Sequence, residues 1–199
     1  MTYVAEKSVV VRPVSSPELN EAVPALSNLL IDTVAGGHGM GFMPPLGYEQ
    51  ARMYWLSLRR ELQAGSRLLL VARYNDRIVA TGQLDLPRWP NARHRAELQK
   101  LMVSSTVRGR GIGRLLMNGL HQAARDRGRS LIVLGARRGS TAEAFYRALG
   151  YREVGVIPGF ATATSGERYD LMSLYRELSE PAEEEVRRFA HDDTKPASV

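Results

Sequence analysis

Apolar and polar positions follow two different periods along this chain. Apolar residues recur at helical spacing over 17–34, over 48–64 and from Ile112 to Gly128, which predicts three helices in these segments. Shorter runs rich in valine, leucine and isoleucine are typical of strands. Such runs cover residues 8–14, 67–74, 77–86, 95–103, 130–136, 151–157 and 168–178.

The segments between these elements indicate how they are connected. The residues "NDR" at 75–77 separate two strands and predict a β-hairpin. Ser140 and Glu143 have the spacing of a capping box, so a further short helix is expected from there to about Gly150. Hairpins in the first half and alternating strands and helices in the second predict an α/β fold of the α+β type, in which helices cover a mixed sheet.

Composition limits the class of protein. With 199 residues, 44% of them apolar, the chain is sufficient for one packed domain, placed at 1–178 before a polar, partly disordered tail at 179–199. No run reaches the roughly 18 apolar residues of a membrane span, and no signal peptide is recognised, so we expect a cytoplasmic protein without membrane contact. The absence of cysteine excludes disulfides, thiolate metal sites and a cysteine nucleophile. The four histidines are scattered, so no metal is expected.

The net charge of +6 is concentrated in arginines between Arg88 and Arg138. Such a basic region is suited to phosphate, which occurs on nucleic acids and on cofactors alike. Nucleic-acid binding is not expected, because Trp89 is the only aromatic residue in this region that could stack on a base.

A glycine-rich segment, "STVRGRGIGRLL" at 105–116, leads directly into a predicted helix. The start of a helix presents unpaired N–H groups and a favourable dipole to an anion, and glycine lets a phosphate approach the backbone. The spacing is neither GxxxxGK[ST] nor GxGxxG, which excludes the two common nucleotide loops. The segment alone therefore predicts a phosphate or pyrophosphate site, with a glycine turn carrying a solvated basic face as the alternative.

Two motifs together resemble the GNAT superfamily of N-acetyltransferases. Arg108, Gly111 and Gly113 follow the strand "LMV" as the family's first motif does. The second motif is matched by "STAEAFYRALGY" at 140–151, except that Gly139 replaces its asparagine. The resemblance implies the GNAT fold, a mixed and mostly antiparallel sheet of about seven strands flanked by about four helices. It also implies acetyl-CoA as the donor.

A narrower resemblance is to the tabtoxin-resistance acetyltransferases. It is carried by "DTVAGGHGMGFM", "RAELQKLMV", "RGRGIGRLLM", "GSTAEAFYRALGY" and "VGVIPGF". It implies transfer of acetyl to a primary amine of a small molecule, such as an amino-acid-like antimetabolite, in toxin or antibiotic resistance. In that subgroup an aspartate ends the strand at which this chain has Gly135, so the acceptor is expected to differ. The alternatives are a protein or peptide N-acetyltransferase and a CoA-binding regulatory module without turnover, and a homodimer is left open.

The resemblance also implies roles for individual residues. Glu97 would be the general base for the amine, and Tyr146 would protonate or hydrogen-bond the departing thiolate. The alternatives are that Glu97 pairs with a nearby arginine and that Tyr146 packs in the core. Cofactor contacts would come from Leu101, Met102, Val103, Arg108, Gly109, Arg110, Gly111, Ile112, Gly113, Arg114, Ser140 and Phe145. The acceptor would contact His38, Phe42, Met43 and Gly135, whereas His121 is expected on the surface.

Overall fold

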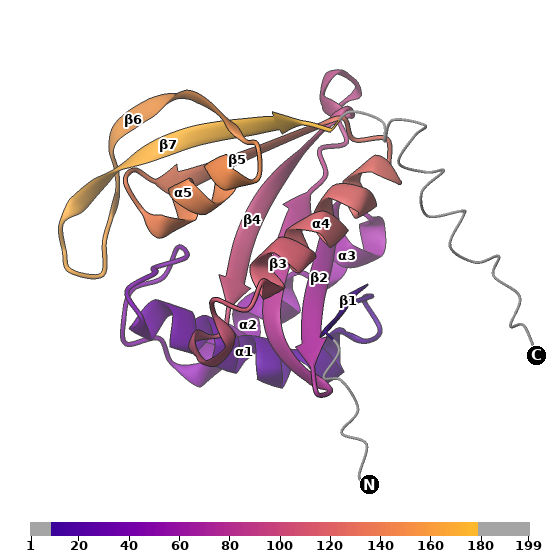
Figure 1. The fold of residues 1–199 in the computed structure, drawn as a ribbon. Coiled ribbons are helices and arrows are strands. Elements are labelled where there is room, and N and C mark those ends of the chain that lie inside the picture. The colour runs from indigo at the N-terminus through magenta and orange to yellow at the C-terminus, as the bar shows by residue number, and fades with distance from the viewer. Residues whose placement is uncertain (1–8, 179–199) are drawn as a thin grey trace, which may run out of the picture.

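The computed structural model describes residues 9–178, and these form one seven-stranded sheet with helices on both faces (Figure 1). The strands are β1 (Val9–Pro13), β2 (Arg67–Tyr74), β3 (Arg77–Asp85), β4 (Arg95–Val103), β5 (Leu131–Arg137), β6 (Arg152–Thr162) and β7 (Arg168–Glu177). Their order is β1-β2-β3-β4-β5-β7-β6, and β4 and β5 are the parallel pair in an otherwise antiparallel sheet. The predicted fold class is confirmed, whereas the predicted tail lies outside the described residues.

The helices follow the predicted positions with one difference. They are α1 (Leu19–Ala35), α2 (Tyr48–Ser57), α3 (Arg59–Ala64), α4 (Ile112–Arg125) and α5 (Thr141–Ala148), with short 3₁₀ turns at η1 (Pro90–Ala92) and η2 (Ser105–Val107). The single helix expected over 48–64 is divided into α2 and α3 at Leu58. There the N–H of Leu58 donates to the carbonyl of Trp55, three residues earlier, at 3.2 Å. No helix in the described part of the chain is long and apolar enough to cross a membrane.

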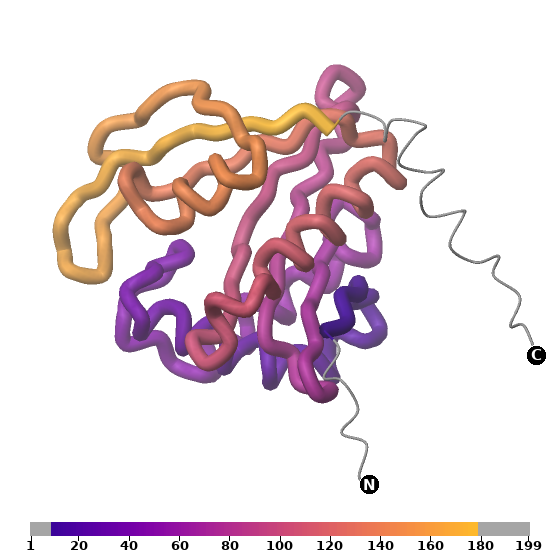
Figure 2. The backbone as a smooth tube through the Cα atoms, viewed as in Figure 1, coloured from indigo at the N-terminus to yellow at the C-terminus, as the bar shows by residue number. Residues whose placement is uncertain are grey.

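Each face of the sheet has its own hydrophobic core. Helices α4 and α5 lie over one face, and α1 to α3 lie over the other (Figures 1 and 2). Strand β2 supplies both cores by alternation, because Leu68 and Leu70 point to the α4 side and Leu69 and Val71 to the α1 side. The sheet is therefore a central layer covered on both faces.

His121 lies in the α4 core rather than on the surface, so that prediction is wrong. Its side chain is 3% exposed and follows Met117 by one helical turn, which places it on the inward stripe of α4. Its Nε2 is 3.0 Å from the hydroxyl of Tyr151, and this contact gives the buried imidazole a polar partner.

Strands β4 and β5 separate along their length, as Figure 2 shows. They pair only over Arg95–Glu97 and Leu131–Val133, although β4 continues to Val103. Lys100 has a φ of 52°, and the register between β3 and β4 shifts at this point, which is the geometry of a β-bulge. The edge of β4 beyond Glu97 is therefore not paired with β5.

Candidate active site

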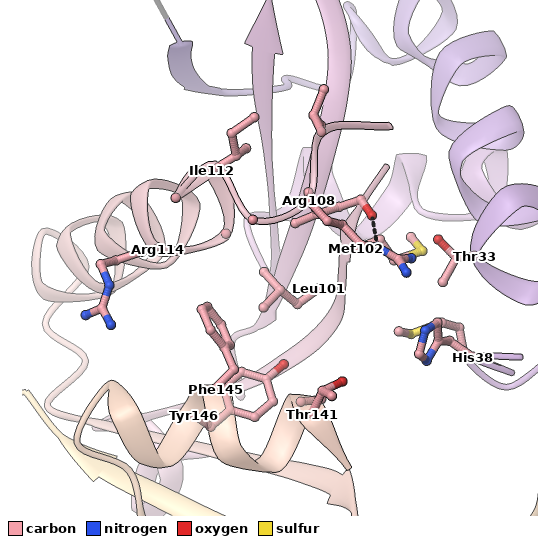
Figure 3. Close-up of a pocket in the computed structure, with 17 residues that line it drawn as sticks. Thr33, His38, Leu101, Met102, Arg108, Ile112, Arg114, Thr141, Phe145 and Tyr146 are labelled. Carbon is pink, nitrogen blue, oxygen red and sulfur yellow. Dashed lines mark hydrogen bonds between the residues drawn. The ribbon is translucent and has the colours of Figure 1, made fainter. Parts of the chain in front are cut away.

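A cavity of about 520 Å³ opens where β4 and β5 separate. It is bounded by the end of β4, the start of α4, one side of α5 and the loop after α1 (Figure 3). Its lining residues are Thr33, His38, Met40, Leu101, Met102, Val103, Val107, Arg108, Gly109, Gly111, Ile112, Gly113, Arg114, Thr141, Ala142, Phe145 and Tyr146. None of these side chains is acidic, whereas two are arginines, so the cavity is suited to an anionic ligand.

The glycine loop brings uncapped backbone N–H groups to this cavity. Gly109 and Gly111 have φ values of 76° and 77°, which favour glycine because other residues are strained there. Gly111 precedes α4 without any side-chain cap, and a Cβ added at either glycine would meet open space. A Cβ at Gly113 would lie only 3.4 Å from the Phe145 ring. The loop thus has both the open space and the free donors that a phosphate group requires.

Arg108 joins the loop to the strand before it. Its Nε donates to the carbonyl of Val103 at 3.1 Å, the contact drawn in Figure 3. Its terminal NH₂ groups hold no hydrogen bond or ion pair within residues 9–178, so they are available to an anion. Burial lowers the pKa of His38, and the positive charge of Arg108 lowers it further.

Tyr146 reaches the cavity from α5 while most of its ring is buried. The side chain is 8% exposed, and the ring contacts Phe145 and Tyr151 with both centroid distances at 5.6 Å. Figure 3 shows the hydroxyl pointing into the cavity, toward Leu101. Burial raises the pKa of Tyr146, so its proton is retained at neutral pH and is available for a hydrogen bond.

Glu97 lies on β4 but does not line the cavity. Its neighbours Ala96 and Leu98 point into the α4 core, so by alternation Glu97 points to the α1 side of the sheet. There its Oε1 accepts a hydrogen bond from Gln99 at 3.2 Å. An action of Glu97 on the cavity would therefore pass through the opening between β4 and β5, for example through a water molecule.

Glu97 belongs to a polar network on that face. Arg67 donates to Gln99 at 3.0 Å and to Gln83 at 3.3 Å, and it forms ion pairs with Glu61 and Asp85. The amide of Gln83 donates in turn to the hydroxyl of Tyr54 at 3.0 Å. The network connects α2, α3, β2, β3 and β4 behind the place where β4 bulges.

Most of the predicted cofactor residues line the cavity, with Arg110 and Ser140 as the exceptions. Arg110 is exposed outside the cavity. The Ser140 hydroxyl caps α5 by accepting from the N–H of Glu143 at 3.2 Å, and Glu143 accepts in turn from the N–H of Gly139 at 2.7 Å. The predicted capping box is present, but it uses the N–H of Gly139 rather than that of Ser140.

The predicted acceptor residues are dispersed. His38 lines the cavity, whereas the ring of Phe42 packs against Tyr54 at 5.4 Å and Met43 is 50% exposed outside the cavity. Gly135 lies on β5 outside the cavity, where an added Cβ would be 2.8 Å from the Leu171 side chain of β7. The space that a side chain at 135 would need is thus occupied by Leu171.

Sequence reasoning missed several residues of the site. Met40 lies on the cavity wall beside His38, and Thr33, Val107, Thr141 and Ala142 also contribute to the lining. It also missed the polar network and Lys100. Gln99 of the network and Lys100 both stood in the quoted run "RAELQKLMV", where Lys100 interrupts the apolar alternation of the strand. Within the described residues, no group of three His, Asp or Glu side chains is arranged to hold a metal.

Comparison with known proteins decides the family. A family model described as "Acetyltransferase (GNAT) family" matches residues 40–151, which include the glycine loop, Glu97 and Tyr146. This chain belongs to the acetyltransferase (GNAT) family. It is therefore an acetyl-CoA-dependent acetyltransferase, and the two motifs that suggested the family lie on the walls of one cavity.

Solved structures share the fold of this acetyltransferase. A ribosomal-protein-alanine N-acetyltransferase from Brucella melitensis is 26% identical, with a TM-score of 0.70, over 85% of this chain and 99% of that one. An acetyltransferase from Salmonella typhimurium, solved with acetyl-CoA, is 18% identical, with a TM-score of 0.69, over 87% and 96%. A protein described as a phosphinothricin N-acetyltransferase is 24% identical, with a TM-score of 0.68, over 87% and 100%. The narrower resemblance to the tabtoxin-resistance enzymes is not confirmed by these findings and stays a prediction.

Proposed function

We propose that this acetyltransferase transfers the acetyl group of acetyl-CoA directly to a primary amine of a small molecule. One observation carries the proposal. A single cavity is lined both by the uncapped, glycine-rich start of α4 and by the hydroxyl-bearing face of Tyr146. The first feature suits the anionic end of the donor, and the second suits the sulfur at its reacting end.

The donor fits the cavity as follows. Its pyrophosphate accepts hydrogen bonds from the N–H groups of residues 109–113, with Arg108 supplying charge, whereas the N–H of Arg114 already donates to the carbonyl of Gly111 at 3.0 Å. Its pantetheine arm lies along Leu101–Val103 and pairs with the edge of β4 that β5 leaves free, as an added strand would. This placement directs the thioester toward Tyr146 and the opening between the two strands.

The chemistry needs two proton transfers. An alkylammonium is not a nucleophile, so Glu97 takes its proton, through water, from the α1 side of the sheet. The amine nitrogen then forms a bond to the thioester carbonyl carbon, and the carbon–sulfur bond breaks. Tyr146 donates a hydrogen bond or proton to the departing sulfur, and the second proton of the amine goes to solvent or, where Tyr146 has protonated the sulfur, restores the Tyr146 hydroxyl. The chain has no cysteine, which agrees with transfer in a single ternary complex.

The direct test is release of free CoA thiol from acetyl-CoA in the presence of an acceptor. The panel contains amino acids, amino-acid-like toxins, polyamines, aminoglycosides and short peptides, and mass spectrometry identifies the acetylated product. We expect a small amine to give turnover and Glu97→Gln to remove most of it while acetyl-CoA still binds. Tight acetyl-CoA binding without thiol release from any acceptor would instead support a regulatory module.

A second candidate acceptor is a protein or peptide N-terminus. It is favoured by the 26% identity to the Brucella enzyme, which is described as acting on alanine of a ribosomal protein. The peptides in the same panel separate the two candidates. Turnover restricted to peptides, together with acetylated N-termini detected in cellular protein, would replace the small-molecule proposal.

A further inference from the structure

Lys100 is unusual in this chain. The sequence has only three lysines among its 27 basic residues, at positions 7, 100 and 195, so Lys100 is the single lysine of the described region. It occupies the bulge of β4 with a φ of 52°, a conformation that is strained for a residue with a Cβ. The next residue, Leu101, lines the cavity. Strain of this kind persists where the surrounding structure enforces it, and it is frequent at functional sites.

The amine of Lys100 is enclosed on the α1 side of the sheet. Its Nζ lies 5.5 Å from the centre of the Tyr54 ring, and a Cβ added to Gly41 would be 3.6 Å from it. The loop that carries His38 and Met40 to the cavity therefore also covers this amine. Burial lowers the pKa of Lys100, and the positive charge of Arg67 lowers it further.

The other charged and polar groups on this face already have partners. Arg67 is paired with Glu61 and Asp85, and Gln99 donates to Glu97. Within residues 9–178, no carboxylate lies within 4.0 Å of the Lys100 amine, which lies instead over the ring of Tyr54. A partly buried cation without a counter-charge is costly, and an anion that binds beside it removes that cost.

We propose that Lys100 binds a carboxylate of the acceptor, so that the preferred acceptor is an amine that also carries a carboxylate. The proposal rests on the proposed function, because it assigns the acceptor to the α1 side of the sheet, where Glu97 also points. Glu97 and Lys100 stand three positions apart on β4, and Lys100 lies in the bulge. One side chain takes the proton of the amine, and the other holds the anion at the far end of the acceptor.

Matched variants isolate the charge of Lys100. Lys100→Met removes the charge, whereas Lys100→Arg keeps it. All three side chains have a Cβ and the same strain at this φ, so the variants differ chiefly in charge. Thermal unfolding of each variant shows that the fold is retained.

The first measurement is kcat/KM for pairs of amino acids and their carboxamides. We expect wild type to prefer the acid. Lys100→Met should reduce kcat/KM for the acid by about 10- to 100-fold, the range for a lost hydrogen bond to a charged group, and leave the carboxamide unchanged. Lys100→Arg should retain the preference. Equal use of acid and carboxamide by wild type, or a preference that persists in Lys100→Met, overturns the proposal.

The second measurement does not need turnover. Calorimetry with the CoA-loaded protein records the binding of N-acetylated amino acids and of their carboxamides. We expect the carboxylates to bind more tightly to wild type and to lose that advantage in Lys100→Met. Carboxylate binding that depends on Lys100, without acetylation of any acceptor, would refute the proposed function but support Lys100 as a carboxylate-binding residue. Acetylation of amines, with no preference for carboxylates over carboxamides in either measurement, would refute the role of Lys100 but support the proposed function.

Discussion

The glycine loop and the polar network lie on opposite sides of β4 and are built from different parts of the chain. The loop and the start of α4 occupy residues 108–114, and they act mainly through backbone N–H groups that any sequence of this pattern supplies. The network joins side chains of five elements that are up to 45 positions apart in sequence, from Tyr54 to Gln99. The proposed donor side is thus formed by residues close together in sequence, whereas the proposed acceptor side depends on tertiary packing.

This difference separates what is general in the molecule from what is specific. A cradle of backbone donors recognises phosphate and is insensitive to most substitutions nearby. In the proposed arrangement, the side chains around Glu97 and Lys100 discriminate between acceptors, because an acceptor lacking the matching group leaves a buried polar atom unpaired. Substitutions on the donor side should therefore change donor affinity or the chemical step, and substitutions on the acceptor side should change selectivity.

The largest effect is expected for Tyr146→Phe. The hydroxyl has no hydrogen-bond partner within residues 9–178, so its removal leaves the packing intact and removes only the group that we propose as the hydrogen-bond donor to the sulfur. We expect kcat to fall by about 10²- to 10³-fold, within the range for general acid catalysis, with an unchanged Kd for acetyl-CoA. Stopped assays of thiol release and calorimetry measure the two quantities. A variant that works at the full rate would remove Tyr146 from the mechanism.

The second-largest effect concerns the free energy of unfolding, and it comes from the buried His121 of α4. Arg176 can only donate, and its Nη1 lies 3.5 Å from Nδ1 of His121, so neutral His121 presents Nε2–H to Tyr151. Burial lowers the pKa of His121 to about 4, with smaller contributions from Arg176 and Arg125. In the unfolded chain the imidazole takes up its proton near its ordinary pKa, so the unfolded state binds more protons between the two values.

The free energy of unfolding should therefore fall as the pH is lowered from about 6.5 to 4, by about 3 kcal/mol from this group, and change little above that range. Denaturant unfolding at a series of pH values measures the fall. His121→Gln should remove this pH-dependent part, whereas His94→Gln, at an exposed position, should keep it. An unchanged profile in His121→Gln would show that the imidazole is not responsible.

Sequence reasoning succeeded where structure is set locally. The apolar patterns located every strand of the described residues, and the glycine spacing located a loop that lines the cavity, because both depend on residues close in sequence. It failed where packing decides. No local signal marks the break at Leu58, and the inward stripe of α4 includes a histidine that composition would place outside. The environment of Lys100 arises from the bulge of β4 and from a loop some 60 positions earlier, at Gly41, so no window of sequence contains it.

The third prediction tests the charge of the donor side. Arg108→Glu reverses a charge on the cavity wall and breaks the contact with the carbonyl of Val103. We expect the Kd for acetyl-CoA to rise by about 10- to 100-fold, and the rise to shrink at high salt. Arg127→Glu, beyond the far end of α4, makes the same charge change as a control. Equal affinity in wild type and Arg108→Glu would move the pyrophosphate away from this loop.

The smallest effect is expected at Gly135. It distinguishes a role of this glycine in acceptor binding from a role in packing within the sheet. A Cβ there would lie 2.8 Å from Leu171, so Gly135→Ala must displace a packed side chain and should lower the free energy of unfolding by about 1 kcal/mol, although alanine is otherwise preferred to glycine in a strand. Acceptor selectivity should not change, because the nearest atoms to a Cβ at position 135 all belong to Leu171 of β7 and not to Glu97 or Lys100. In a Leu171→Ala background the same substitution should become neutral or stabilising, since the obstacle is gone. Loss of selectivity without loss of stability would instead assign position 135 to the acceptor side, and the boundary between the two sides would then run through β5 rather than along β4.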